Sequence, residues 1–324
     1  MLSLRELNRA TLGRQLLLRR ERLTVTQALE RVAGLQAQWA PSLPVGLWTR
    51  VEGFEGAQLD RAVARKSVVR ATLMRATIHL VSTRDYLHFH PALADAITRK
   101  YRRPHEDPAE LQRFAAQFVA AAQQPVPGKE LRALVDADWW FRTLQHARLL
   151  RIGDDYVAAD TWLDQSHETP QKGLAHLLRR YLSAWGPATA ADAAAWSGLQ
   201  VSELREQLER VGTRRFKDEQ GRQLYDVPRA PLPPADPPAA PRLLPRFDNT
   251  ILSHADRTRV IADEHRKSVI RAGEVDPVVL VDGFVAGRWR RKNRHIVVEW
   301  LEDVTRTDRQ QVEDEARRLE AFLG

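Results

Sequence analysis

The chain has 324 residues, of which 43% are hydrophobic and 28% are charged, and it contains no cysteine. This balance is typical of a globular protein with two or three domains, and the absence of cysteine excludes disulfides and thiolate metal sites. The formal net charge of +8 and the sequence pI of about 10.1 favour nucleic acid as a partner. No stretch is apolar enough for a membrane span or a signal peptide, so we expect a cytoplasmic protein.

Arginine dominates the basic residues, because only seven of the 50 are lysine, which leaves 43 arginines. A guanidinium group binds phosphates and guanine edges through two parallel hydrogen bonds, which suits a DNA-binding surface. A chain rich in alanine and arginine also follows from a GC-rich genome, so the ratio by itself does not separate the two explanations.

Residues 1–105 are predicted to form a first unit of helices followed by an apolar hairpin. Helical spacing of apolar residues is found over 4–20, 26–36 and 57–65. Alternation with a period of two predicts the two strands of the hairpin over 68–73 and 76–82.

The same order recurs in residues 106–168 and 169–227. The second unit has expected helices over 110–123, 128–136 and 139–147 and a hairpin over 149–152 and 156–159. The third unit has expected helices over 171–184, 189–197 and 201–211 and a hairpin over 213–217 and 223–227. Three helices and a hairpin are the order of a winged helix, and a helical bundle with incidental hairpins is the alternative. Three copies favour winged helices.

Residues 228–241 are half proline and predict an extended surface linker to a C-terminal portion over 242–324. There we expect a strand over 242–252, a hairpin turning at Asp282-Gly283, and a second hairpin turning at Asn293-Arg294. An apolar stripe over 312–323 predicts a closing helix. The predicted fold is therefore a helix-rich α+β chain: three tandem winged-helix units followed by a small antiparallel β-barrel-like portion.

The most unusual local sequence is Gln36-Ala37-Gln38-Trp39 followed by Ala40-Pro41. Residues at i and i+2 lie on opposite sides of a regular helix, so both glutamines point one way only if the chain leaves the helix here. Pro41 favours that exit, because proline moves the preceding residue out of the helical region. Two amides at a helix end can each donate and accept, although two polar residues that merely close a helix give the same pattern.

Two further stretches carry candidate DNA-binding side chains. In RATIHLV at 75–81, a strand would place Arg75, Thr77 and His79 on one face, where they contact DNA or form the wet face of a wing. In SHADRTRV, Asp256 is expected to orient either Arg257 or Arg259 while the other arginine meets phosphate, with His254 as a neighbour. A structural ion pair is the alternative for the second stretch, and His254 with Asp256 is too sparse for a metal site.

The densest basic run surrounds the predicted Asn293-Arg294 turn. Its candidate phosphate-binding residues are Arg288, Arg290, Arg291, Lys292 and Arg294. The alternative is a merely solvated loop.

Five segments resemble the AlkZ-like family of bacterial DNA glycosylases and occur in that family's order along nearly the whole chain. They are LQAQ at 35–38, RATIHLV at 75–81, GPATAADAAAWSGL at 186–199, LLPRFDNTILSHADRTRV at 243–260 and VLVDGFVAGRWRR at 279–291. The resemblance implies tandem winged helices with a C-terminal β-barrel. It also implies cleavage of the N-glycosidic bond of N7-alkylated purines, for some members in interstrand crosslinks or as self-resistance to genotoxic natural products.

The family's catalytic Gln-x-Gln motif falls on Gln36 and Gln38, where a sister branch carries Gln-x-Asp. Trp39, His254 and Asp256 are then candidates for residues that support the site. We expect a monofunctional glycosylase, because no lysine is placed as a Schiff-base nucleophile. We also expect it to act as a monomer on damaged double-stranded DNA, without a cofactor or metal. A non-catalytic DNA-binding regulator and a family member that binds lesions without excising them are the alternatives.

Overall fold

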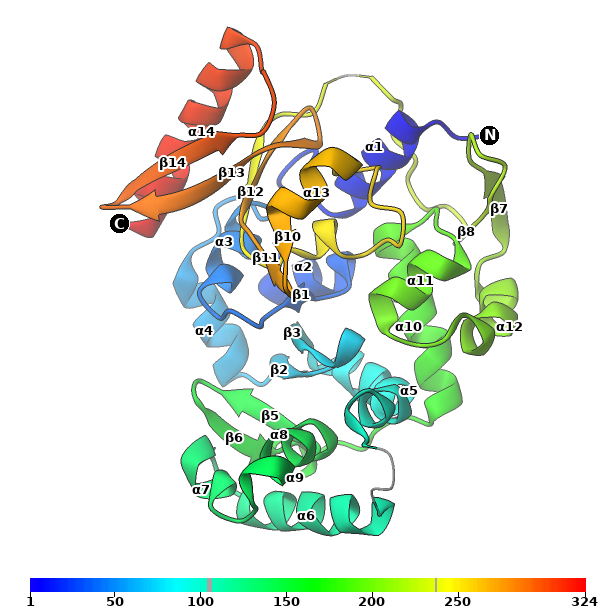
Figure 1. Cartoon of the computed structure of the whole chain (residues 1–324), viewed down its shortest axis with the longest axis vertical. Helices are drawn as coiled ribbons and strands as arrows, with labels where there is room; N and C mark the ends of the chain where they lie inside the picture. Colours follow the sequence, from blue (N-terminus) through cyan, green and yellow to red (C-terminus); the bar gives the residue numbers. More distant parts are fainter. Residues whose placement is uncertain (104–106, 237) are drawn as a thin grey trace.

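The structure is a computed structural model that describes residues 1–103, 107–236 and 238–324 of an α+β chain. Its N-terminal segment runs to Tyr101 (Figure 1). The elements there are α1 (Leu4–Arg14), α2 (Val25–Val32), β1 (Leu35–Gln36), α3 (Ser42–Trp48), α4 (Gly56–Ala64), β2 (Val68–Thr72), the 3-10 turn η1 (Met74–Ala76), β3 (Ile78–Ser82) and α5 (Thr83–Tyr101).

Two expected helices in this segment are shorter than predicted. Helix α1 ends at Arg14 and not at residue 20, and α2 ends at Val32 with Ala33 in the left-handed conformation, so Gln36 lies in a strand and not in a helix. Helices α3 and α5 were not predicted. Helix α5 contains Pro91 and many aromatic residues, which weaken its helical pattern in the sequence.

The second segment contains α6 (Pro108–Ala121), β4 (Val126–Pro127), α7 (Gly128–Arg132), α8 (Ala137–His146), β5 (Leu149–Ile152), β6 (Asp155–Ala158) and α9 (Ala159–Leu163). Its hairpin does not stand alone, because β5 pairs with β2 of the first segment. The result is one six-stranded sheet of order β1-β3-β2-β5-β6-β4. The first two helix-and-hairpin segments therefore share a sheet.

The third segment follows its predicted pattern closely. It contains α10 (Pro170–Trp185), α11 (Ala190–Ser197), α12 (Val201–Val211), β7 (Arg214–Lys217) and β8 (Gln223–Asp226). Thr189 caps α11 in a capping box with Asp192, and Gly198 ends it at φ +84°, a conformation that favours glycine. Helix α10 packs on α5, and their apolar residues belong to the largest core cluster, which also includes Leu150 and Val157 of the second hairpin.

The described part of the Pro-rich segment forms no regular helix or strand and lies along α1. Arg14 Nε donates to the oxygen of Pro231 at 3.1 Å, and Arg5 Nε donates to the oxygen of Ala235 at 3.1 Å. These hydrogen bonds hold the segment to the N-terminal helix.

The C-terminal portion contains β9 (Arg242–Leu244), the 3-10 turn η2 (Asn249–Ile251), α13 (Asp263–Val269), β10 (Ile270–Arg271), β11 (Glu274–Val275), β12 (Val278–Val281), β13 (Phe284–Lys292), β14 (His295–Trp300) and α14 (Arg306–Leu323). Strands β14, β13, β12 and β9 form an antiparallel sheet in that order. Its two edge strands do not pair with each other in the described residues, so this sheet is open and not a closed barrel. The strand expected over 242–252 ends at Leu244, since the chain turns into η2.

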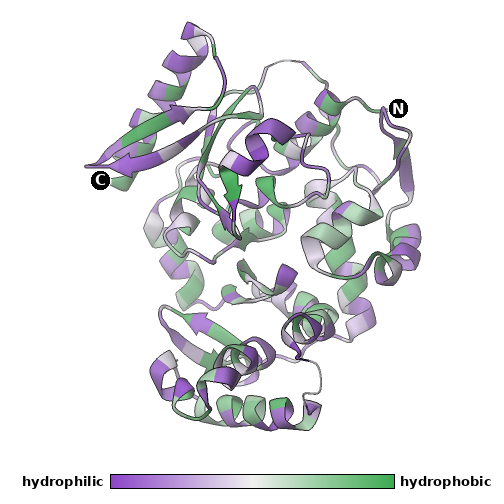
Figure 2. Cartoon of the chain, viewed as in Figure 1, coloured by the Kyte–Doolittle hydropathy of each residue, from purple (hydrophilic) through white to green (hydrophobic). Residues whose placement is uncertain are grey.

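Both predicted two-residue turns are present. Asp282-Gly283 and Asn293-Arg294 all have positive φ, as a tight hairpin turn requires. Helix α14 packs against the sheet through Val312, Ala316 and Leu319. In Figure 1 the β13–β14 hairpin and α14 project at the opposite end of the molecule from α6 to α9. Figure 2 shows β12 coloured as hydrophobic and the far end of the hairpin as hydrophilic.

Candidate active site and basic groove

The Gln-x-Gln segment leaves α2 through two residues with positive φ, Ala33 (59°) and Gly34 (85°). A side chain at Gly34 would meet Val81, because a Cβ there would lie 2.7 Å from Val81 Cγ1. The chain then runs extended and pairs with β3, with Gln36 opposite His79. Strand β1 ends at Gln36 and Gln38 lies in the bend that follows, while Leu35 and Ala37 are buried.

Each glutamine uses its carbonyl oxygen inside the protein. Gln36, which is only 7% exposed, accepts a hydrogen bond from Arg75 Nη2 at 2.7 Å. Gln38 is exposed and its Oε1 accepts from the backbone N–H of Ile78 at 3.3 Å. Arginine and a backbone N–H can only donate, so these contacts fix which end of each amide is the oxygen. Both amino groups have no hydrogen-bond partner among the described residues.

Arg75 is not on the strand face that its sequence predicted. It lies in η1 with φ 55°, and β3 begins only at Ile78. Its Nη1 donates to the oxygen of Trp196 at 2.8 Å, and its Nη2 donates to Gln36 and to Asn249 Oδ1 at 3.0 Å. Burial, together with the nearby charge of Arg257, lowers the pKa of Arg75 to about 10, so it remains charged at neutral pH.

His79 and Thr77 support this turn from within the protein. His79 is fully buried, and burial beside Arg75 lowers its pKa to about 3, so the ring is neutral at physiological pH. Its Nδ1 lies 3.0 Å from the oxygen of Thr77 and carries the proton, which leaves Nε2 as an acceptor 3.4 Å from Arg75 Nη2. Thr77 Oγ1 donates to the oxygen of Met74 at 3.0 Å.

Asn249 is a site residue that sequence reasoning missed. Besides accepting from Arg75, its Nδ2 donates to the oxygen of Gly34 at 3.3 Å. It therefore connects η2 of the C-terminal portion to the turn that precedes Gln36. Its only signal in the sequence was its position inside the family-like segment 243–260, because the contact depends on three segments that are distant in the chain.

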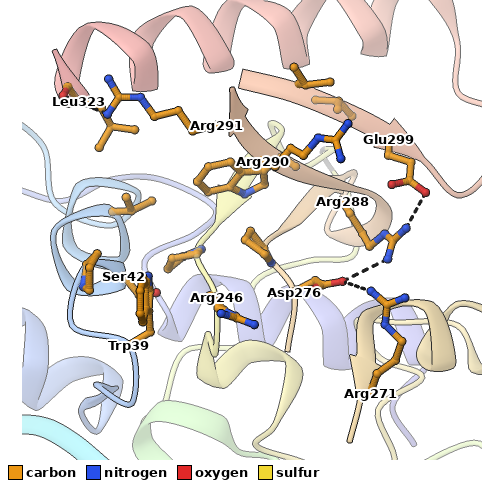
Figure 3. A pocket seen from close by; sticks show the side chains of 17 residues that line it. Trp39, Ser42, Arg246, Arg271, Asp276, Arg288, Arg290, Arg291, Glu299 and Leu323 are labelled. Atoms are coloured by element: carbon orange, nitrogen blue, oxygen red, sulfur yellow. Dashed lines mark hydrogen bonds and ion pairs between the residues drawn. The ribbon is translucent and has the colours of Figure 1, made fainter. Parts of the chain in front are cut away.

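A groove of about 1090 Å³ adjoins the Gln-x-Gln segment (Figure 3). Trp39, 51% exposed, lies with Ser42 on one side, and Arg288, Arg290 and Arg291 of β13 lie on the other. Arg246 and Arg271 also line it. A small void of about 10 Å³ beside Gln36 shares Ser42, Pro245 and Arg246 with this groove, and it is of the size of roughly one water.

The predicted basic run divides into two kinds of residue. Arg288 is neutralised by Asp276 at 3.1 Å and by Glu299 at 2.5 Å, and Arg291 donates to the backbone oxygens of Leu323 and Gly324. The remaining three are exposed and have no ion-pair partner in the part of the chain that the structure describes. They are Arg290, Lys292 and Arg294.

The SHADRTRV segment is mostly internal, and its expected ion pair is wrong. Asp256 pairs with Arg222 at 2.8 Å and not with Arg257 or Arg259. Arg259 is buried and donates to the oxygen of Pro187 at 3.2 Å.

The other two residues of that segment differ in exposure. His254 is buried, its Nε2 donates to the oxygen of Trp185 at 3.0 Å, and burial with the charge of Arg259 lowers its pKa to about 3. Arg257 is partly exposed, and within the described ranges it has no hydrogen-bond or ion-pair partner. Burial lowers its pKa. Arg257 is therefore the one predicted residue of this segment whose charge acts on Arg75.

No group of three histidine, aspartate or glutamate side chains in residues 1–103, 107–236 and 238–324 is arranged to hold a metal ion. In the same residues no helix has both the length and the apolar character needed to cross a membrane.

Comparison with known proteins identifies the family of this chain. The model of the family described as DNA glycosylase AlkZ-like matches residues 29–322, so the chain belongs to the AlkZ-like DNA glycosylase family. A curated relative, the interstrand DNA cross-link repair glycosylase of Streptomyces sahachiroi, is 31% identical over 163 residues. That match covers 48% of this chain and 44% of the relative, which is less than half of its length.

A solved structure, the Streptomyces sahachiroi DNA glycosylase AlkZ, superposes with a TM-score of 0.84. The superposition covers 99% of this chain and 97% of that one at 22% identity, and at this identity it establishes the fold.

Proposed function

We propose that the protein is a monofunctional DNA glycosylase that hydrolyses the N-glycosidic bond of purines carrying N7-alkyl or bulky adducts in double-stranded DNA, interstrand crosslinks included. The product is an abasic site. The observation that carries the proposal is the pair Gln36 and Gln38, whose side-chain carbonyls are both held by residues 75–78 beside a groove lined with arginine. Membership of the AlkZ-like family supports it.

The chemistry suits two amides. An N7-alkylated guanine is already cationic, so it leaves without a proton from a general acid. The enzyme then needs chiefly to hold a water near the anomeric carbon and to stabilise the developing oxocarbenium ion with oriented dipoles. Each glutamine has a free amino group and a carbonyl with one remaining lone pair, so one amide can donate to a water while the other accepts from it. No group with a pKa near neutrality is required.

The three helix-and-hairpin segments are proposed to be winged-helix units that hold DNA against this pair. Their proposed boundaries are 1–105, 106–168 and 169–227, followed by the linker 228–241 and the C-terminal portion 242–324. The exposed residues Arg290, Lys292, Arg294 and Arg257 are the proposed phosphate contacts, and Trp39 supports the bound DNA beside Gln38. We propose that the protein acts as a monomer in the cytoplasm.

The test is a single-turnover excision assay with purified protein. Duplexes carry one N7-methylguanine, one polycyclic N7-guanine adduct or one interstrand crosslink, with an unmodified duplex as control, and alkaline cleavage reports abasic sites. We expect excision of at least one adduct, and a loss of about 100-fold or more in rate for Gln36→Ala/Gln38→Ala with unchanged DNA affinity. An undiminished rate in the double variant contradicts the proposal. Absence of any excision, together with protection of one defined operator, identifies a regulator instead.

A further inference from the structure

Arg75 joins four parts of the chain at the Gln-x-Gln centre. Its guanidinium contacts Gln36 of β1, Trp196 of α11 and Asn249 of η2, and it lies next to His79 of β3. The backbone at Arg75 is also held, because Lys100 of α5 donates to its carbonyl oxygen. A turn in the left-handed conformation therefore places one guanidinium against the side chain of Gln36.

The partners of Arg75 differ from those of Arg14 and Arg50. Arg14 forms a pair of hydrogen bonds with the carboxylate of Asp226, and Arg50 does the same with Asp248. Arg75 has only neutral acceptors among the described residues, and the charge of Arg257 repels it. Burying a cation without a carboxylate is costly, and an apolar side chain would fill the same space more cheaply. Arg242 and Arg259 share this lack of a carboxylate partner, since both bond only backbone oxygens. Arg75 differs from them because it also binds the side-chain carbonyl of Gln36.

The geometry assigns Arg75 a role through Gln36. We infer that Arg75 is a positioning residue for the proposed glycosylase reaction: it binds the carbonyl of Gln36 and thereby turns the amino group of Gln36 toward the substrate. This inference rests on the proposed function. A flipped amide would set its N–H groups against the guanidinium, and losing that hydrogen bond disfavours the flip by roughly tenfold or more.

The charge of Arg75 adds a second effect. A cation that binds an amide oxygen draws electron density from the amide, so its N–H groups become stronger donors. The Nε2 of Gln36 has no hydrogen-bond partner among the described residues, so its N–H groups are available to a water or to substrate. Gln36 therefore acts toward water or substrate mainly as a hydrogen-bond donor, and Asn249 and Trp196 keep Arg75 in place.

The experiment compares Arg75→Met with the wild type on the adduct that the wild type excises. We expect the single-turnover rate at saturating protein to fall by about 10- to 100-fold, while the dissociation constant for DNA stays within twofold. The salt dependence of that constant also stays the same, whereas losing an arginine that contacts phosphate lowers its logarithmic slope by about 0.9. An unchanged rate, or weaker binding with a lower slope, overturns the inference.

A double-mutant cycle separates positioning from a general structural role. If Arg75 acts through Gln36, the Arg75→Met/Gln36→Ala variant is no slower than Gln36→Ala alone, and additive losses overturn the inference. Arg242→Met is the matched control, because Arg242 is a buried arginine that has no carboxylate partner and bonds backbone oxygens, those of Pro241 and Leu18. We expect this control to excise at the wild-type rate, and a loss equal to that of Arg75→Met overturns the inference.

If Arg75→Met does not fold, Arg75→Lys carries the same test, since an ammonium keeps the charge but cannot reach both Trp196 and Gln36 as the two arms of the guanidinium do. We expect a smaller loss of rate that again disappears in the Gln36→Ala background, and a wild-type rate overturns the inference. Failure of the proposed function looks different, because then Gln36→Ala itself retains full activity. A slow Gln36→Ala variant beside a fully active Arg75→Met variant overturns the positioning role alone.

Discussion

At the centre around Gln36, the half-buried Arg75 contacts neutral acceptors from four segments of the chain through its guanidinium. At the far end of the β13–β14 hairpin, by contrast, Arg290, Lys292 and Arg294 extend into solvent without an ion-pair partner in the described residues. Both regions are positive and both border the Gln-x-Gln segment or its groove. They differ in the partners of their charged groups: Arg75 contacts groups of the protein, whereas the hairpin side chains are open to solvent.

The difference shows that residue type does not decide the role of a basic side chain here. A buried guanidinium keeps fixed partners and can orient a neighbour, whereas an exposed one is free to exchange water and counterions for phosphate. We therefore expect substitutions at the centre to change rate or stability, and substitutions at the hairpin to change affinity.

The largest effect is expected where a buried charge has a buried partner. Arg50 and Asp248 have side chains 0% and 1% exposed, and Asp248 directly precedes Asn249. Arg50→Met leaves the carboxylate of Asp248 buried and unpaired, which should lower the free energy of unfolding by about 3–5 kcal/mol in urea denaturation. Arg22→Met, which removes the exposed pair with Glu52, is the control and should change little. Equal stability of the two variants would contradict this account of burial.

Lowering the pH is expected to reduce the free energy of unfolding by less than the Arg50→Met substitution does. Burial lowers the pKa of His79, His90 and His254 to about 3, below the value near 6.5 of an unfolded chain. As pH falls, the unfolded state therefore binds protons first and stability is lost. Between pH 7 and pH 6 the three histidines together should lower the unfolding free energy by about 2 kcal/mol. Urea titrations at the two values measure this, and constant stability would show that these rings are not buried in the neutral form.

The smallest effect is expected at the hairpin. Reversing the charge of Arg290, Lys292 and Arg294 should weaken binding to any duplex by about tenfold or more at low salt and flatten its salt dependence by about 2.7 in logarithmic slope. Fluorescence anisotropy with unmodified DNA measures both quantities. Arg288→Gln is the matched control, because its charge is already neutralised by Asp276 and Glu299. Unchanged affinity of the triple variant at low salt would remove the hairpin from the interface.

Local patterns predicted the α+β class, the hairpin over 149–158, helix α12 and both two-residue turns, because periodicity and turn residues act within a few positions. They also predicted that the chain leaves its helix near Gln36 and Gln38, although α2 ends earlier, at Val32, and Gln36 lies in a strand. The pairing of β2 with β5, the open C-terminal sheet and the partners of Arg75 depend on segments that are distant in the chain. No spacing rule reports such contacts.

Because local patterns do not show contacts between distant segments, they also do not separate internal arginines from those that can bind DNA. In the sequence, Arg259 and Arg288 lie among other basic residues and resemble parts of a basic patch. In the structure, Arg259 donates to a backbone oxygen, and Arg288 pairs with two carboxylates. Burial and pairing are properties of the tertiary structure. The exposed arginines could be separated from the internal ones only after the chain was folded.

We expect chemistry and DNA binding to reside in separate regions of the molecule. The most direct test measures both the single-turnover excision rate at saturating protein and the DNA affinity for Gln36→Ala/Gln38→Ala and for the hairpin triple variant. We predict that the glutamine variant loses rate and keeps affinity, while the hairpin variant loses affinity and keeps its maximal rate. A glutamine variant that excises adducts at the wild-type rate, or two variants that lose rate and affinity in parallel, would contradict the account.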